Sequence, residues 1–571
     1  MNEEQEQKNI QVRALLAFGL SAVVLFLYQY FMVKPAPPAP PPAAKTSAPP
    51  APAAKTSAAP EPAAPVSPAA VQAAAEQTLV VETDSYLVAF SNRGAVVTSW
   101  TLKQYKDDAG RPLELVNTAS AAEPEIGFPF SFQVRDNPPA ANLNQVLYQV
   151  ETSVPAFARL AAPVTLTFRW SDGALRASKT FRFSKTSYLV EVHSSLTQAK
   201  APLPHLLAWR GGFGDAAVLD AARSVKTFYF DAATQKLEHL EASAAEKAPV
   251  LNAGNYLYAG IEDLYFAAAF LTADTGRSLQ LETSARQTAT PKEPKKQLFA
   301  GAAFGMGADN RFLVYVGPKQ LQVLRSVREP LTQLVDFGFF GFLAYPLFLI
   351  LSWFHRYIPN FGWAIVVLTI IINFVLFPLK LKSMKSMKRM QKLQPLIKNI
   401  QDKYKGLPLR DPRRQDQNQE VMALYKKHGV NPLGGCLPML LQLPFFFAFY
   451  TVLTVTIEMR HAPWLWVQDL SSPENLAFGF LRVLPILMIA TQFWYQKMTP
   501  ATTADPAQQK MMQFMPLIMG FFFYSLSSGL VLYWLTGNLV GIAQQWFINR
   551  LPEPAMEHTV SRKGKLKKSK S

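Results

Sequence analysis

Two short basic segments, each beside long stretches without any charged residue, constrain the fold of this chain more than any other feature. Residues 380–428 hold 14 Lys/Arg against 4 Asp/Glu, and residues 549–571 hold 7 against 2. Together they carry fifteen of the seventeen net positive charges. A nucleic-acid-binding protein spreads its basic residues over a folded face, whereas basic loops beside apolar spans mark the cytoplasmic side of membrane proteins. The pattern predicts an integral membrane protein with both segments in the cytoplasm.

The uncharged stretches predict six membrane spans. Residues 14–33 are twenty uncharged residues, enough to cross about 30 Å of hydrocarbon. A cleaved signal peptide is the alternative for this stretch, but no A-x-A cleavage pattern follows it, which favours an uncleaved anchor. Residues 511–549 are 39 uncharged residues, too long for one span, and Ser527-Ser528-Gly529 indicates a turn within them. The predicted spans are 14–33, 361–379, 430–457, 477–497, 511–527 and 529–549. The span 477–497 extends beyond its uncharged stretch, 483–496, and includes Arg482 and Lys497.

The region between the first span and the others predicts a linker and a large soluble domain. Residues 34–77 are rich in Pro and Ala, a composition that favours an extended tether. From 78 to 320, apolar and polar residues alternate with period two between turn residues. That alternation predicts an antiparallel β domain, most simply a β-sandwich.

The segment 330–358 is harder to interpret, because it contains eighteen uncharged residues from 337 to 354 interrupted by Pro346. A span here would place the basic segment 380–428 outside the cell, against the positive-inside rule. We therefore expect an interfacial amphipathic helix. The fold class is a multi-domain membrane protein: an anchor helix, a periplasmic β-sandwich and a five-helix transmembrane core. The remaining segments are an N-terminal tail at 1–13, a periplasmic loop at 458–476, a cytoplasmic loop at 498–510 and a basic cytoplasmic tail at 550–571.

The basic segment 380–428 predicts a cytoplasmic helical hairpin. Methionines recur at helical spacing along its first half, with lysines on the other faces. This stripe either packs the hairpin against itself or forms a flexible surface for varied apolar partners. The residues concerned are Met384, Met387, Met390, Lys385 and Lys388.

The fully uncharged stretches carry a small set of neutral polar side chains. Thr369 and Asn373 are four residues apart and share one helix face, and Gln442 lies deep in its span. The absence of ionisable residues there argues against an ion-coupled pump. Each polar residue could simply bond a neighbouring helix, or together they could line a wet groove. Gly537 and Gly541 form a small-xxx-small pattern that favours close helix packing.

Patterns for catalysis and for bound metals are missing from the sequence. The seven histidines are scattered without metal-ligand spacing, and the nucleotide-binding and nucleophile motifs do not occur. The lone Cys436 excludes an intrachain disulfide. We expect a protein that is not an enzyme and has no cofactor.

Two strings are more specific than any periodicity. NPLGGCLPMLLQLPFFFAFY at 431–450 and DPAQQKMMQFMPLIMGFFFYSLSSGLVLYWLTGNLVGIAQQW at 505–546 resemble the YidC/Oxa/Alb family of membrane protein insertases. The resemblance is dense from about 330 to 550. It extends more loosely to the start of the β domain, in the manner of the Gram-negative branch.

The resemblance implies a function that spacing alone does not reach. Members insert newly made proteins into the bacterial inner membrane, alone or beside the Sec translocon, and assist their folding. Five core helices enclose a hydrophilic groove open to the cytoplasm and to lipid, and no nucleotide is consumed. It also implies a multi-pass protein with both termini in the cytoplasm and a large periplasmic domain, in contact with nascent membrane proteins and lipids.

Carried over by position, the resemblance implies a set of groove residues. Family members place an arginine on the first core helix, where this chain has Asn373. Either that charge is dispensable here, or Lys380 and Lys382 at the groove mouth substitute for it. The implied groove residues are Thr369, Asn373, Gln442, Phe446, Phe522, Tyr533 and Trp534.

The basic tail resembles ribosome-contacting tails, and the basic hairpin at 380–428 is a second expected place of ribosome contact. Contact with anionic lipid is a nearly equal alternative for the tail. The tail residues concerned are Lys565, Lys567, Lys568 and Lys570. No sequence-specific binding to nucleic acid is expected.

Two other functions remain open from the sequence. One is a channel or lipid transporter whose periplasmic domain binds a ligand, which predicts an inverted internal repeat. The other is a translocon-associated chaperone without insertase activity of its own.

Overall fold

The computed structural model describes most of the chain after the linker, and all of the described residues belong to one compact unit, Ser67–Ser571. The predicted anchor at 14–33, nearly all of the linker and the four tail lysines lie outside the described residues. The described ranges are 70–123, 125–154, 159–216, 218, 221–272, 278–288, 295–407, 411–430, 437–475, 481–500 and 506–552.

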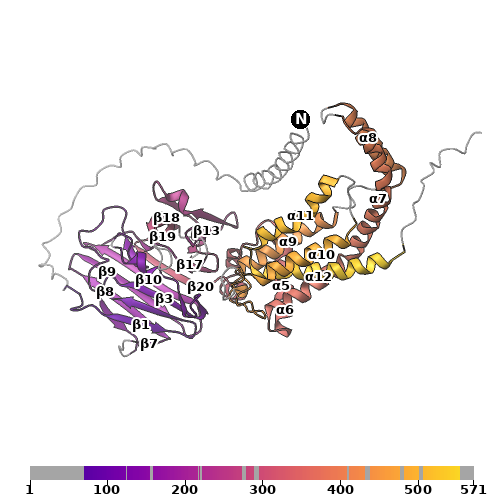
Figure 1. The fold of residues 1–571 in the computed structure, drawn as a ribbon. Helices are drawn as coiled ribbons and strands as arrows, with labels where there is room; N and C mark the ends of the chain where they lie inside the picture. The colour runs from indigo at the N-terminus through magenta and orange to yellow at the C-terminus, as the bar shows by residue number, and fades with distance from the viewer. Residues whose placement is uncertain are drawn as a thin grey trace, which may run out of the picture. The chain divides into compact units, whose positions relative to one another are not determined.

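The region predicted as β structure forms three sheets, drawn from indigo to pink in Figure 1. The first has the order β4-β3-β2-β1-β7. Its strands are β1 (Thr78–Glu82), β2 (Tyr86–Ser91), β3 (Val96–Lys106), β4 (Pro112–Glu114) and β7 (Arg159–Ala161). The pairing of β1 with β7 is parallel, unlike the antiparallel pairing that the alternation predicted. A parallel pair needs a long crossover, and the chain supplies one from β1 through β6 to β7.

The second sheet is the largest, with the order β14-β13-β16-β17-β20-β10-β9-β8-β6 and β11 paired to β10. Its strands are β6 (Gln149–Thr152), β8 (Val164–Ser171), β9 (Leu175–Phe183), β10 (Leu189–Gln198), β11 (Ala201–Pro202), β13 (Lys226–Asp231), β14 (Lys236–Glu241), β16 (Tyr256–Glu262), β17 (Phe266–Thr272) and β20 (Asp309–Pro318). The third sheet has the order β15-β18-β19-β12-β5. Its strands are β5 (Ser131–Gln133), β12 (His205–Trp209), β15 (Val250–Gly254), β18 (Leu279–Thr288) and β19 (Gln297–Gly307).

Alternate side chains of these strands build a core rich in aromatic residues. In β9 the residues at 175, 177, 179, 181 and 183 are buried and those between them are more exposed. Phe90, from the first sheet, packs against Phe181 of the second with ring centroids 4.9 Å apart. The period-two pattern therefore predicted the buried face of the domain correctly. Short helices occur beside the strands: α2 (Thr118–Ala121), α3 (Ala221–Ser224), η1 (Ala242–Ala245), α4 (Leu321–Val327) and η2 (Glu329–Leu334).

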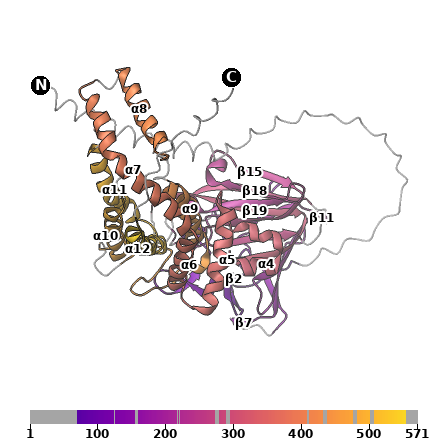
Figure 2. The ribbon, with the colours of Figure 1, turned by 90° about the vertical axis from the view of Figure 1, so that its right-hand side faces the viewer.

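The second half of the described chain is helical, as the apolar stretches predicted. Figures 1 and 2 show α7 and α8 side by side as a hairpin that projects from the other helices. The helices are α5 (Gly341–Tyr357), α6 (Phe361–Val375), α7 (Phe377–Lys403), α8 (Arg413–Lys427), α9 (Leu437–Val455), α10 (Val483–Met498), α11 (Pro506–Phe523) and α12 (Ser528–Arg550). A short turn, η4 (Ile457–Met459), follows α9.

The break predicted at Ser527-Ser528-Gly529 is present, because α11 ends at Phe523 and α12 begins at Ser528. The backbone amides of Ser528 and Gly529 donate to the carbonyls of Ser472 and Leu470. The turn is thus held by the loop that precedes α10. The predicted span at 511–527 ran past the end of α11, because its residues up to 527 stay uncharged and composition alone does not mark where the helix stops.

The segment predicted as an interfacial helix is η2 followed by α5. One face of α5 packs against α6 and α9 and buries Ala344, Leu347 and Leu351. Its other face exposes further apolar side chains, including Phe342 and Trp353. A helix that is apolar on its exposed side is suited to lipid contact; its place at the membrane interface stays a prediction.

Within the described residues, no helix taken alone combines the length and hydropathy of a membrane span. One pair passes that test together: α6 and α7, which meet at a bend of 56°. Pro378 stands in the first turn of α7, where its missing N–H interrupts the hydrogen bonds that would continue α6. The bend is therefore encoded by the sequence.

Candidate functional site

The polar face of α6 is a short ladder of side-chain bonds. The Thr369 hydroxyl donates to the Ile365 carbonyl at 2.7 Å, and the Asn373 amide donates to the Thr369 carbonyl at 2.8 Å. Both side chains are buried. The i, i+4 spacing predicted this shared face. It leaves the Asn373 side-chain oxygen directed toward the bend.

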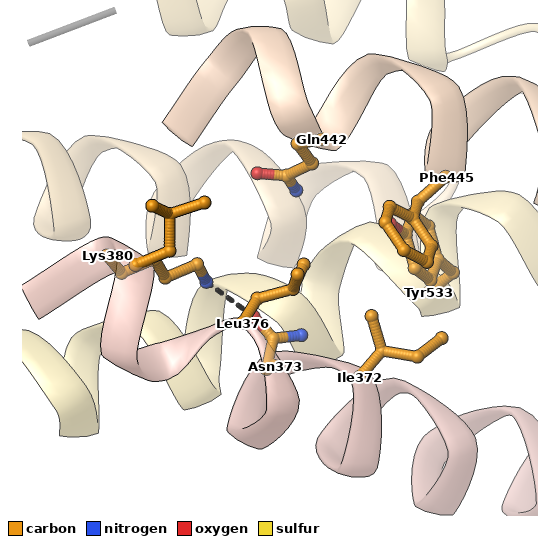
Figure 3. A pocket seen from close by; sticks show the side chains of 8 residues that line it. Ile372, Asn373, Leu376, Lys380, Gln442, Phe445 and Tyr533 are labelled. Atoms are coloured by element: carbon orange, nitrogen blue, oxygen red, sulfur yellow. Dashed lines mark hydrogen bonds between the residues drawn. The ribbon is translucent and has the colours of Figure 1, made fainter. Parts of the chain in front are cut away.

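Across the bend, Lys380 reaches back to that oxygen. Its Nζ donates to Asn373 Oδ1 at 2.6 Å, and Figure 3 shows the two side chains pointing toward each other from α7 and α6. A hydrogen bond from an ammonium is stronger than one between neutral groups. Of the two lysines predicted at the groove mouth, Lys380 therefore meets Asn373, whereas Lys382 is exposed.

A small cavity lies beside this pair, between α6, α7, α9 and α12 (Figure 3). It brings together three of the predicted groove residues, Asn373, Gln442 and Tyr533. The Tyr533 ring stacks on Phe449 at 4.4 Å, so the ring is held in place while its edge borders the cavity. The full lining is Ile372, Asn373, Leu376, Leu379, Lys380, Gln442, Phe445 and Tyr533.

The other predicted groove residues lie elsewhere. Phe446 and Trp534 form an aromatic cluster next to the cavity, with ring centroids 5.4 Å apart, and Trp534 Nε1 donates to Gln492 Oε1 at 3.1 Å. Thr369 is fully buried against the α6 backbone. Phe522 is 56% exposed on α11, with its neighbour Phe521 more exposed still. Their part in substrate contact stays a prediction.

The two glycines of α12 bring their neighbours close. A Cβ at Gly541 would lie 3.1 Å from the Tyr495 ring of α10, and one at Gly537 would lie 4.0 Å from Asn373 Nδ2 of α6. Between the two glycines, Asn538 donates to the Met488 carbonyl of α10 at 3.3 Å. The small-xxx-small pattern therefore serves close packing, as predicted.

The methionine stripe of the hairpin is buried. Met390 packs with Leu393 and Ile397 against α8, whereas Met384 and Met387 pack against Ile548 of α12. Packing of the hairpin against itself, one of the two predicted alternatives, therefore holds for Met390, whereas Met384 and Met387 pack against a different helix. Lys385 is exposed, while Lys388 Nζ donates to the Ile548 carbonyl at 2.8 Å.

Gln544, which the sequence did not predict as a groove residue, bonds the predicted groove directly. Its Nε2 donates to the backbone carbonyl of Asn373 at 3.0 Å. The available signal was a pair of adjacent glutamines, 544 and 545, within a predicted membrane span. In the described part of the chain, His, Cys, Asp and Glu side chains form no group of three that could hold a metal ion.

Comparison with family models covers nearly the whole described chain. The model of the YidC periplasmic domain matches residues 78–350. The model of the 60Kd inner membrane protein matches residues 353–555. The junction between the two falls within α5, next to the change from strands to helices.

Individual relatives match this chain over most of its length or over part of it. A membrane protein insertase YidC from Syntrophus aciditrophicus is 33% identical over 565 residues, which cover 94% of this chain and 99% of the relative. One from Wolinella succinogenes is 47% identical over 240 residues, 42% of this chain and 43% of the relative. One similar solved structure is described as an active YidC insertase with the first transmembrane domain resolved. The two chains are 18% identical, and the match covers 83% of this chain and 93% of the other. The TM-score of this match is 0.34.

Proposed function

Because this chain belongs to the YidC family of membrane protein insertases, we propose that it inserts new membrane proteins by way of the cavity beside Asn373 and Lys380. The polar terminal segment of a client enters there, while its apolar segment passes into lipid. The protein provides no covalent step and acts as an insertase rather than an enzyme. Burial of the client's apolar segment in lipid supplies the driving force.

The observation that carries the proposal is the Lys380–Asn373 pair at the border of the cavity. Placing a polar group at membrane depth costs free energy. A polar side chain at that depth is therefore expected to serve a function. Neutral partners, Gln442 and Tyr533, line the same space. Both side chains are neutral, so they offer hydrogen bonds to a passing backbone without adding a fixed charge to that of Lys380.

The pair also accounts for the missing arginine. Lys380 places an ammonium on Asn373 Oδ1, so a positive charge reaches the position through two residues instead of one. A client with an acidic tail is then attracted by Lys380, and Asn373 holds that ammonium in place. We propose that both hydration and charge act here.

The exposed apolar face of α11 is proposed as the path for the client's apolar segment. Phe521 is 79% exposed and Phe522 56%, with Phe514 at 57% on the same helix. Lipid and a client helix are equally apolar, so a client can slide along such a face without a large change in free energy.

The membrane arrangement and the partners belong to the same proposal. Spans at 14–33, 361–379, 430–457, 477–497, 511–527 and 529–549 would place the β domain in the periplasm and both termini in the cytoplasm. The Sec translocon is a partner for clients with large translocated domains. Anionic lipid or the ribosome contacts the basic tail.

The test is insertion of a short single-span client into liposomes that contain this protein alone. Protease protection of the client's translocated tail is the readout. We expect protection well above that of empty liposomes. Absence of protection by correctly oriented, folded protein would instead support a translocon-associated chaperone, and solute leakage without protection would support a channel.

A matched set of variants at Asn373 tests the chemistry of the cavity. Asn373→Leu removes the oxygen that holds Lys380, and Asn373→Arg restores the arrangement that the family resemblance implies. We expect a clear loss of insertion in the first and near-normal insertion in the second. Full activity of Asn373→Leu would contradict a role for this pair.

A further inference from the structure

Gln544 joins two segments that are far apart in the sequence. Its side-chain amide donates to the Asn373 carbonyl, 171 residues away, at 3.0 Å. The residue is 8% exposed. Asn373 is the residue whose side-chain oxygen holds Lys380. Gln544 thus contacts the backbone of the cavity pair immediately before the bend between α6 and α7.

One turn further along α12, a second bond reaches the far side of the bend. The Ile548 carbonyl accepts from Lys388 Nζ at 2.8 Å, and the Ile548 side chain packs against Met384 and Met387. Residues 544 and 548 are an i, i+4 pair on one face of α12. The last two turns of α12 therefore hold α6 before the bend and α7 after it.

Because α7 is long, these two bonds from α12 strongly affect the position of the hairpin. Helix α7 has 27 residues, a length of about 40 Å at 1.5 Å per residue. A small change in the bend therefore moves the hairpin by several ångströms. Because Pro378 removes a backbone donor at the bend, side-chain bonds from α12 replace part of the missing restraint.

We propose that Gln544 is a positioning residue that sets the bend of α6 on α7, and so couples the angle of the cytoplasmic hairpin to the placement of Lys380 at the cavity. The part about Lys380 rests on the function proposed above. The part about the hairpin angle does not.

The first experiment measures the angle directly. Spin labels are placed on Asn399→Cys of α7 and Leu487→Cys of α10, both exposed positions, with the single native Cys436 replaced by serine. Residue 399 lies 22 residues beyond the start of α7, about 33 Å, so a change of about 10° moves it by about 6 Å. Electron–electron double resonance resolves such a shift.

The chain supplies a matched control for the substitution. Gln544→Met keeps the length of the side chain and removes the donor. Gln545→Met makes the same change at the next residue, which is 1% exposed and bonds Asn549 within its own helix at 2.9 Å. We expect Gln544→Met to shift or broaden the label distance by about 5 Å or more, and Gln545→Met to leave it unchanged.

The second experiment compares insertion of two clients that differ only in tail charge, one acidic and one neutral. A variant that merely destabilises the protein lowers both equally. We expect Gln544→Met to lower the ratio of acidic to neutral insertion several-fold, because Lys380 is displaced, and Gln545→Met to preserve it.

The outcomes distinguish the claim that Gln544 sets the hairpin angle from the claim that it places Lys380. An unchanged distance distribution in Gln544→Met overturns the inference. A changed distance with a preserved ratio overturns the coupling to Lys380, provided that Lys380→Met lowers the ratio. If Lys380→Met also preserves the ratio, the proposed function fails while Gln544 still sets the hairpin angle.

Discussion

The β domain holds a fully buried lysine and the helical core a partly buried one, and the two are bound in opposite ways. Lys179 in β9 is fully buried, and its Nζ donates to the carbonyls of Gly94, Ala95 and Phe130 at 2.8, 3.1 and 2.7 Å. An ammonium has three donors, so every one is used. Lys380 in α7 donates to a neutral amide, the Asn373 side-chain oxygen, and borders a cavity.

This difference in hydrogen-bond partners distinguishes a structural lysine from one that can bind a client. Lys179 ties a turn of the first sheet to the second sheet and has nothing left to offer a ligand. Lys380 retains donors and an adjacent space, so a client carboxylate can approach it. A buried lysine therefore indicates a binding function only where its donors are not all used by the protein itself.

The largest loss of stability is expected for Lys179→Met, which removes the buried ammonium of the β domain. Three buried carbonyls would lose their donor, at about 1–3 kcal/mol each, partly offset because no ammonium then needs desolvation. We expect the β domain to lose about 4 kcal/mol of unfolding free energy. Urea-dependent protease resistance of the purified protein measures it, with the exposed Lys185→Met as the unaffected control. Equal stability of the two variants would contradict a structural role.

A second buried base of the β domain gives a pH dependence. His205 is 3% exposed and bonds Ser194 Oγ at 2.8 Å, and burial lowers its pKa from 6.5 to about 4. The unfolded chain therefore binds a proton that the folded domain does not, so stability is present above pH 6.5 and is lost as pH falls toward 4. The loss amounts to about 3 kcal/mol.

The same protease measurement at pH 7 and pH 4.5 checks this. His205→Phe should be less stable at pH 7 and should show a smaller loss on acidification than the native protein. The same loss in both proteins would show that His205 does not contribute.

A smaller change in stability is expected when the glycines of α12 that contact neighbouring helices are replaced by alanine. Gly541→Ala places a methyl 3.1 Å from the Tyr495 ring, whereas Gly537→Ala meets Asn373 Nδ2 only at 4.0 Å. We expect the first to cost about 1–2 kcal/mol by overpacking and the second to be neutral or stabilising. Thermal unfolding in detergent distinguishes them. Equal effects would mean that α10 and α12 separate more easily than this contact suggests.

The sequence carried most of the information about the β domain. Alternation predicted the buried faces of strands such as β9. Lys179 stands at an inward position of that strand, between Ala177 and Phe181, although it was not named from the sequence beforehand. A lysine at an inward position was the signal for a buried ammonium. Its acceptors could not be predicted, because Gly94 and Phe130 lie in turns whose placement depends on tertiary packing.

For the helical core, composition predicted the helices and spacing predicted the Thr369–Asn373 face. Lys380 was named because it lies near the groove mouth, yet its bond to Asn373 depends on a 56° bend. Gln544 could not be placed at all, because its partner is 171 residues away. Contacts between helices follow from packing and leave no periodic signal in either segment.

The most direct test of the central claim compares Lys380→Met with Lys382→Met. Lys382 is exposed and does not line the cavity, so the pair differs in position and not in chemistry. Each purified variant is assayed for insertion of a client with an acidic tail and of the same client with a neutral tail. We predict that Lys380→Met lowers acidic-tail insertion about tenfold, equivalent to losing about 1.4 kcal/mol of interaction, with unchanged stability, and that Lys382→Met inserts both normally. Equal insertion by the two variants would contradict the assignment of Lys380 as the groove's charge.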